Sequence, residues 1–145
     1  MKILPLTLFI FFLLPLSART SDISLRKSQF YFKVSKATLD GRDMTKALRK
    51  VKAYTVFYYE DGTLNMANVW KRTKSKSFGP IGLIRSCRIK SEKHKGTIYF
   101  FQWNYQNSYN KHSGKTDVTL VKMQESVKLY IGKPNKNWTI YEGAI

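Results

Sequence analysis

Residues 96–105 read Gly96-Thr-Ile-Tyr-Phe-Phe-Gln-Trp-Asn-Tyr105, and this stretch decides the fold. Aromatic and β-branched residues favour β-strands. Large rings occur at both parities of the stretch, with Tyr99 and Trp103 on one face and Phe100 on the other, so neither face can be fully solvated. The sequence therefore predicts a central strand that the rest of the chain covers.

A β-hairpin over residues 53–70 is the clearest local element. Two alternating apolar runs flank Asp61-Gly62, and both of these residues tolerate the positive φ of a tight hairpin turn. In the second run, Asn68 is a polar residue at the parity of Met66.

Further alternating segments predict additional strands, and short connections between successive strands favour an antiparallel meander. Since a barrel or sandwich limits exposed sheet edges, we expect an all-β fold, a small antiparallel β-barrel or β-sandwich with one short helix. The additional strand segments are 28–39, 81–89, 115–123, 127–131 and 138–141.

The short helix is predicted at residues 43–50. Asp43 is a candidate N-cap, and Met44, Leu48 and Val51 recur at near-helical spacing. Because a helix of about two turns is marginal in water by itself, we expect it to lie across a barrel end or a sheet edge.

The region before and within segment 81–89 carries two further expectations. Gly79-Pro80 is expected to stop regular structure locally. Leu83 and Cys87 share a parity, and Cys87 is the single cysteine, so it has no partner for an internal disulfide. A buried, inert thiol is favoured over a reactive or dimer-forming one.

Residues 1–18 have the pattern of a cleavable signal peptide: Lys2 precedes an apolar run that ends in small residues near Ala18. A membrane anchor is disfavoured, because the run is shorter than the roughly 20 residues that a bilayer requires and contains Pro5 and Pro15. The sequence thus predicts a secreted or periplasmic protein.

Residues 19–145 are predicted to form a single β-domain, because 127 residues (145 minus 18) suit one core. The full chain has a formal charge of +17, and removal of Lys2 leaves 25 basic and 9 acidic side chains, or +16. This excess attracts polyanions and anionic membranes, although it also serves solubility.

No catalytic residue, metal site or cofactor is predicted, and we expect a non-enzymatic binding domain. The nine carboxylates are scattered, and the sequence contains neither a phosphate-binding Gly-rich loop nor a nucleic-acid-binding motif. His94 and His112 lie in basic segments without a neighbouring carboxylate. A hydrolase that uses these two histidines as an acid–base pair is the weaker alternative.

Two binding modes are open. Tyr54, Tyr58, Tyr99 and Trp103 are predicted to line a barrel cavity that holds a small apolar or amphipathic ligand, unless these rings form a packed core. Alternatively, basic residues interleaved with rings bind anionic polymers or membranes, unless they are simply solvated. The anion-binding candidates are Lys71, Arg72, Lys74, Lys76, Arg88 and Lys90.

The sequence contains four further distinctive stretches and one tyrosine: Asn65-Met-Ala-Asn-Val-Trp70, Ser77-Phe-Gly-Pro-Ile81, Phe100-Phe-Gln-Trp103, Tyr109 and Tyr141-Glu-Gly143. Together these features resemble a group of small exported proteins from Bacteroidetes. The resemblance implies a bacterial, secreted or periplasmic origin and brings no functional residues with it. Lipocalins share the general architecture, but their Gly-x-Trp entry motif is missing from the first strand.

Overall fold

The computed structural model describes residues 30–91, 93–134 and 136–145. The signal peptide predicted for residues 1–18 lies outside the described residues. The elements in chain order are β1 (Phe30–Lys33), β2 (Lys36–Leu39), β3 (Arg42–Asp43), α3 (Thr45–Lys50), β4 (Ala53–Glu60), β5 (Thr63–Trp70), the 3-10 turn η2 (Lys71–Thr73), β6 (Ser75–Lys90), β7 (Lys95–Asn107), β8 (Ser113–Met123), β9 (Ser126–Lys133) and β10 (Lys136–Ala144).

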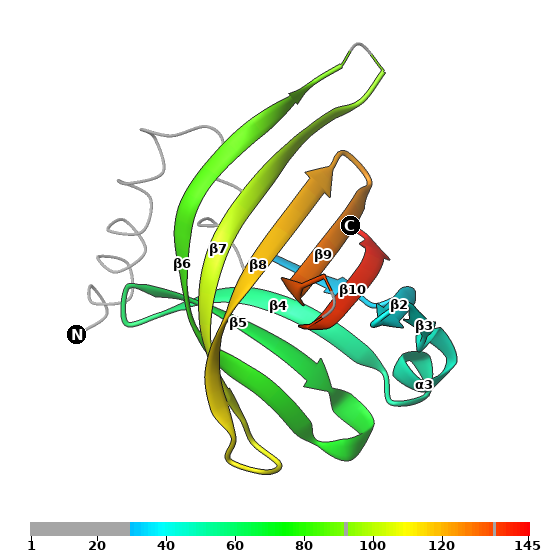
Figure 1. Ribbon diagram of the computed structural model, residues 1–145, viewed down its shortest axis with the longest axis vertical. Coiled ribbons are helices and arrows are strands. Elements are labelled where there is room, and N and C mark those ends of the chain that lie inside the picture. The colour runs from blue at the N-terminus through cyan, green and yellow to red at the C-terminus, as the bar shows by residue number, and fades with distance from the viewer. Residues whose placement is uncertain (1–29, 92, 135) are drawn as a thin grey trace, which may run out of the picture.

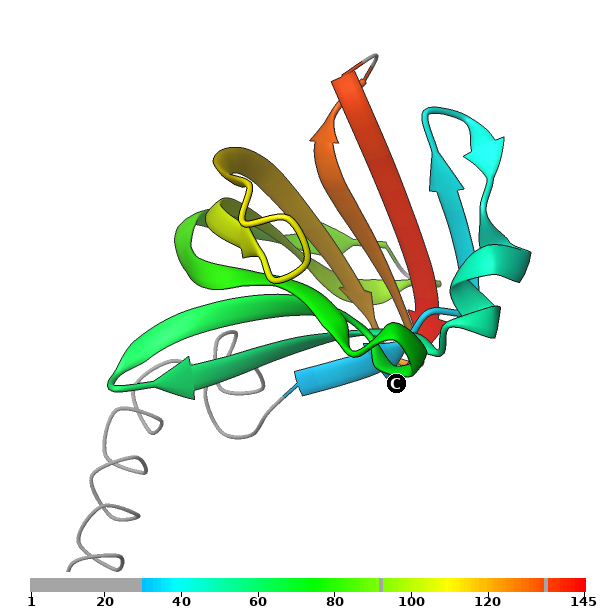
Figure 2. The same ribbon diagram turned by 90° about the horizontal axis from the view of Figure 1, so that it is seen from below.

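All ten strands belong to one antiparallel sheet, in the order β1-β4-β5-β6-β7-β8-β9-β10-β2-β3. The sheet curls into a half-barrel with a concave inner face (Figures 1 and 2). The predicted all-β, barrel-like fold with one short helix is confirmed. Within the described residues, no helix combines the length and the apolar character needed to cross a membrane.

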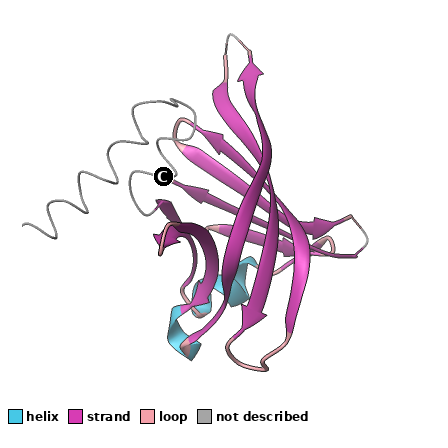
Figure 3. Cartoon of the chain, turned by 90° about the vertical axis from the view of Figure 1, so that its left-hand side faces the viewer, coloured by secondary structure: helices cyan, strands magenta, loops and turns pink. Residues whose placement is uncertain are grey.

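β7 is the predicted central strand, paired with β6 on one side and β8 on the other. Tyr99, Phe101 and Trp103 point to the concave face and are buried, whereas Phe100 is half-buried on the convex face beneath the Arg85 guanidinium. Beyond the middle of the sheet, the β6–β7 hairpin projects past the other strands (Figure 3). In the middle of the sheet, the rings on both faces of β7 are therefore at least half-buried, as predicted.

The β4–β5 hairpin forms as predicted, with Asp61 and Gly62 at φ values of 49° and 76°. Both residues therefore adopt the positive φ of a primed turn. Asn68 is the polar residue among the apolar side chains on the inner face of β5. It has a hydrogen-bond partner on β4, because the Thr55 hydroxyl donates to Asn68 Oδ1 at 2.8 Å.

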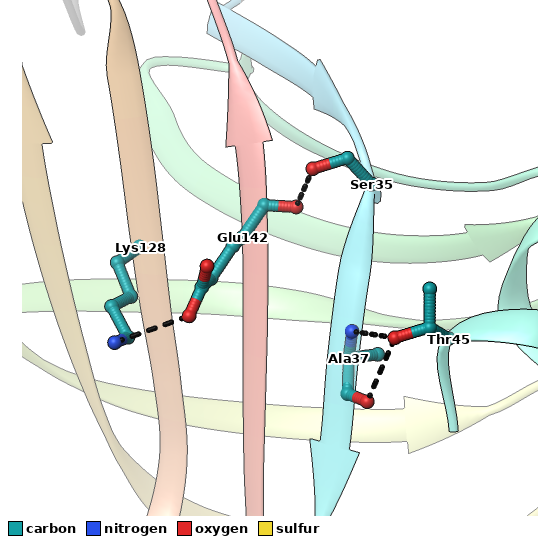
Figure 4. Close-up of polar contacts among 5 residues, drawn as sticks. All are labelled: Ser35, Ala37, Thr45, Lys128 and Glu142. Atoms are coloured by element: carbon teal, nitrogen blue, oxygen red, sulfur yellow. Dashed lines mark hydrogen bonds and ion pairs between the residues drawn. The ribbon is translucent and has the colours of Figure 1, made fainter. Parts of the chain in front are cut away.

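The consecutive strands β1 and β2 lie near opposite ends of the curled sheet. β1 pairs with β4, and β2 pairs with β10, so the chain between them crosses from one end of the sheet to the other. At the crossing, Val34 N–H donates to the Ala53 carbonyl (3.0 Å), and Ser35 donates to the Glu142 carbonyl through its N–H (2.8 Å) and its hydroxyl (3.0 Å; Figure 4). The Glu142 carboxylate also pairs with Lys128 at 3.1 Å, a surface pair worth about 0–1 kcal/mol.

Helix α3 packs beside β2, as its apolar spacing requires. It begins at Thr45 rather than at Asp43, and the Asp43 carboxylate accepts the Thr45 N–H at 2.9 Å. The Thr45 hydroxyl accepts the Ala37 N–H at 3.0 Å, which ties the helix to β2 (Figure 4). Met44, Leu48 and Val51 pack against the hydrophobic core.

The expected break at Gly79-Pro80 is wrong, because β6 runs through both residues as one strand of 16 residues. Pro80 faces Asn65 in the pairing with β5, and on the other side the β7 backbone comes very close to Gly79. A glycine permits this approach because it has no Cβ.

The expectation of a buried Cys87 is also wrong, since its thiol is free and exposed. The pairing of β6 with β7 slips by one residue between Leu83 and Arg85. Such a bulge moves every following side chain to the opposite face. Leu83 pairs with the core residue Phe101, but Cys87 pairs with Ile98 on the convex side.

The core fills one part of the concave face. Rings from β1, β4 and β7 dominate it, and aliphatic side chains from β8 and β9 complete it. The most deeply buried large side chains are Tyr99, Phe32, Phe57, Phe101, Met66, Leu120 and Leu129.

Candidate functional site

The concave face also holds a pocket of about 420 Å³, which we name the cup pocket. Its lining comes from β5 to β10 and from the β7–β8 connection. Ligand pockets of proteins occupy roughly 300–1,000 Å³. The cup pocket therefore has the volume of a small-molecule site, in the part of the half-barrel that the core leaves open.

Aromatic rings form one part of the lining. Trp70 and Tyr109 meet edge to face with their centroids 6.0 Å apart, and Trp103 and Tyr105 lie 5.3 Å apart. Trp103 is almost fully buried, and its indole N–H donates to the Gly79 carbonyl at 3.2 Å, which fixes its ring. Tyr109 is 60% exposed. The rings thus run from a fixed floor to an exposed rim.

Polar groups form the other part of the lining, contributed by Asn68, Ser77, Lys115, Thr116 and Thr139. Two of them are engaged within the protein: Asn68 accepts from Thr55, and the Ser77 hydroxyl donates to Asn107 Oδ1 at 2.5 Å. A site of this kind combines apolar surface with a few placed hydrogen-bonding groups.

Tyr141 is the most informative group in the cup pocket. Its side chain is 7% exposed, and within the described part of the chain its hydroxyl has no hydrogen-bond partner. Buried polar groups are nearly always hydrogen-bonded. A buried hydroxyl on a lining residue, with no partner in the described part of the chain, therefore marks a position where a ligand can accept or donate a hydrogen bond.

Burial raises the pKa of Tyr141 to about 12, and the neighbouring Tyr109 adds to this shift. In the unfolded chain the group titrates near 10.0. Because the folded pKa is raised, the native state holds its proton between these values while the unfolded state has lost it. The unfolding free energy therefore falls as the pH rises from about 10 to 12.

We expect the Tyr141→Phe variant to remove this pH dependence. In the wild type, one tyrosine should ionise near pH 12 in an ultraviolet absorbance titration, and this step should be missing in the variant. Between pH 10 and 12, the unfolding free energy of the wild type should fall more steeply than that of the variant by up to about 1.4 kcal/mol per pH unit. A difference between the two titrations near pH 10 and none near pH 12 would show that the hydroxyl is solvated.

The structure does not bring the four predicted ligand-binding rings together. Trp103 lines the cup pocket, whereas Tyr99 is 1% exposed and stacks on Phe101 in the core. Tyr54 and Tyr58 have the opposite parity from the core residues of β4 and lie on the convex side, in separate hollows. Burial raises the pKa of Tyr58, and the charge of Glu60 adds to the effect.

The predicted anion-binding residues fall into two groups at different ends of the molecule. Lys71 and Arg72 belong to η2, Lys74 ends it in the left-handed conformation, and the Lys76 ammonium lies 4.5 Å from the Phe78 ring centroid. The second group, Arg88 and Lys90, lies near the tip of the projecting β6–β7 hairpin.

The two histidines are also separated. His94 precedes β7 and His112 follows it, and a strand of 13 residues spans about 40 Å. His112 lies beside the Tyr105 ring, with the centroids 6.2 Å apart. Among the described residues, no group of three or more His, Cys, Asp or Glu side chains is placed to hold a metal ion. The two histidines therefore lie at opposite ends of β7, and the hydrolase alternative stays a prediction.

Several residues of the cup pocket were not predicted as ligand-binding residues. Thr139 and Tyr141 alternate on β10, and this period-two pattern is a signal that the sequence contains. Tyr109 lies between β7 and β8, where no periodicity indicates the direction of a side chain. Trp70 directly precedes the anion-binding candidates Lys71 and Arg72 in the sequence, but it lines the cup pocket.

Comparisons with protein-family models, with curated proteins and with solved structures found no match to this chain. The resemblance to exported proteins of Bacteroidetes and the predicted export stay predictions.

Proposed function

We propose that this domain is an exported, non-enzymatic binding protein that holds a small amphipathic ligand in the cup pocket. The observation that carries the proposal concerns Tyr141, which lines the pocket and whose buried hydroxyl has no hydrogen-bond partner in the described chain. The ligand has an apolar face that lies on Trp103 and Tyr109 and a polar edge that meets Tyr141 and Thr139. The rings supply affinity, and the hydroxyls supply orientation.

The neutral fluorescent compound N-phenyl-1-naphthylamine tests this proposal, because it is amphipathic and has no charge to engage the basic surface. We expect Tyr109→Ala to weaken its binding by about five- to tenfold, the loss of one aromatic contact. Fluorescence titration measures the affinity.

Tyr31→Ala is a matched control, because Tyr31 is 59% exposed and Tyr109 is 60% exposed, but Tyr31 lies outside the cup pocket. This variant should bind the compound like the wild type. Equal affinities of all three proteins, or an effect of Tyr31→Ala alone, would place the binding of this compound elsewhere.

A further inference from the structure

A second hollow, which we name the basic cleft, is lined in part by the side chains of Tyr31, Lys33 and Tyr54, which have the opposite parity from the core residues of β1 and β4. It has a volume of about 580 Å³ and is formed by β1, the start of β4, the end of α3 and η2. Figure 2 shows α3 and η2 on the same side of the molecule as β1. The cup pocket and the basic cleft have no lining residue in common.

Four cations surround the basic cleft: Lys33, Arg49, Lys52 and Lys71. Arg49 and Lys52 lie in one stretch at the end of α3, and the fold adds Lys33 from β1 and Lys71 from η2. The lining contains no carboxylate. The two ion pairs found in the described residues involve Lys128 and Lys133, so neither neutralises this cluster.

Hydrogen bonds hold the segments of the basic cleft in place. Arg49 Nε donates to the Ser35 carbonyl at 3.0 Å, which fixes the guanidinium over the crossing between β1 and β2. Arg72 N–H donates to the Val51 carbonyl at 3.0 Å and thereby joins η2 to the end of α3. These bonds bring the backbone of Lys71 close to that of Lys52 although neither lysine takes part in them.

Lys52 itself occupies an unusual backbone position. Its φ is 53°, in the left-handed region just after the helix, where glycine is the usual residue. A non-glycine residue pays a steric penalty at such a position. The chain therefore places a cation at the cleft where an uncharged glycine would be the less strained choice.

Two tyrosines complete the lining and supply ring surface beside the charges. Lys33 and Tyr54 are direct partners in the β1–β4 pairing, so their side chains are adjacent on the same face. Tyr31 is two residues before Lys33 on that face, and 59% of its surface is exposed. Cations next to rings bind a charged group and an adjoining flat group together.

We propose that the basic cleft binds the phosphate or sulfate group of a ligand whose ring or chain lies against Tyr31. Several cations converge on one hollow, and a tetrahedral oxyanion accepts hydrogen bonds from more than one of them. This site is separate from the ligand site of the proposed function. The oxyanion belongs either to a small soluble ester or to a lipid headgroup, and the two sources share the same recognition chemistry.

Phenyl phosphate is the soluble probe, and calorimetric titration measures its affinity. The double variant Lys52→Gly/Lys71→Gln removes two cations of the cleft, and we expect it to bind at least about tenfold more weakly, because hydrogen bonds to charged groups are stronger than those between neutral groups. Glycine accepts the left-handed φ, so the melting temperature should not fall. Wild-type affinity should also fall with added NaCl.

The matched control is Lys46→Gln/Lys50→Gln, which removes the same charge from exposed positions on α3 outside the lining. This control should retain wild-type affinity for phenyl phosphate. Equal weakening by both double variants would show binding to the overall charge and would overturn the proposal. Unchanged affinity of the cleft variant for phenyl phosphate would overturn the proposal as well. So would a wild type that binds neither phenyl phosphate nor the phospholipid vesicles described in the next paragraph.

Two further measurements separate the sources and the two sites. Binding to phosphatidylglycerol vesicles and not to phosphatidylcholine vesicles, lost in the cleft variant but not in the control, assigns the oxyanion to a lipid headgroup. Binding of phenyl phosphate alone assigns it to a soluble ester. The cleft variant should bind N-phenyl-1-naphthylamine normally, and Tyr109→Ala should bind phenyl phosphate normally, so failure at one site is distinguishable from failure at the other.

Discussion

Replacing Gly79 by alanine is expected to lower the free energy of unfolding by about 3 kcal/mol or more, because β6 and β7 must separate to admit the new methyl group. An alanine Cβ at this position would lie 2.0 Å from the Asn104 carbonyl oxygen and 3.1 Å from its carbon, both in the backbone of β7. Backbone atoms within a paired strand cannot rotate away as a side chain can. Urea unfolding followed by tryptophan fluorescence measures the loss.

Gly82→Ala is the matched control within the same strand. Nothing lies within 4 Å of a Cβ built at Gly82, so this substitution should change the unfolding free energy by no more than about 0.5 kcal/mol. Because the Gly79 carbonyl accepts the Trp103 indole N–H, the Gly79 variant should also bind N-phenyl-1-naphthylamine less well. Equal stability of the two variants would contradict the close approach of β6 and β7.

Phe57→Ala is expected to cost about 3–5 kcal/mol, the range observed for truncation of a fully buried phenylalanine. Phe57 has no exposed surface, and its ring centroid lies 5.9 Å from those of both Phe30 and Phe101. It therefore links the ring of β1 to the ring of the central strand. Truncation leaves a cavity among these rings that the curled sheet cannot easily fill.

The same urea experiment provides the measurement for Phe57→Ala, with Tyr31→Ala on the neighbouring strand as an aromatic control. Tyr31 is mostly exposed, so its truncation should change stability by about 0.5 kcal/mol or less. The transition of the Phe57 variant should shift to lower urea concentration with an unchanged slope if the native state stays compact. A shift no larger than that of the control would place Phe57 outside the core.

Local signals in the sequence were sufficient for much of the fold. Asp61-Gly62 between alternating runs predicted the β4–β5 hairpin, since the turn depends on the conformational preferences of two adjacent residues. Rings at both parities predicted the central place of β7. The spacing of Met44 and Leu48 predicted α3, and only its first turn differs from the prediction.

Signals that depend on a partner strand were misread. The bulge after Leu83 reverses the parity of β6, so a pattern that assumed strict alternation placed Cys87 on the wrong face. Local preferences alone predict that Gly79-Pro80 ends a strand. In the folded protein the glycine permits the close approach of the Asn104 backbone, and β6 continues through both residues.

The sequence by itself determined that the chain forms an antiparallel β-fold with aromatic rings on both faces of its central strand, because side-chain alternation and turn preferences act over a few residues. Tertiary structure alone decided the two candidate sites. The cup pocket joins residues from six strands, and the basic cleft joins Lys33, the pair Arg49 and Lys52, and Lys71 from three segments. The curl of the sheet and its register set these distances, and neither is written in any short stretch of residues.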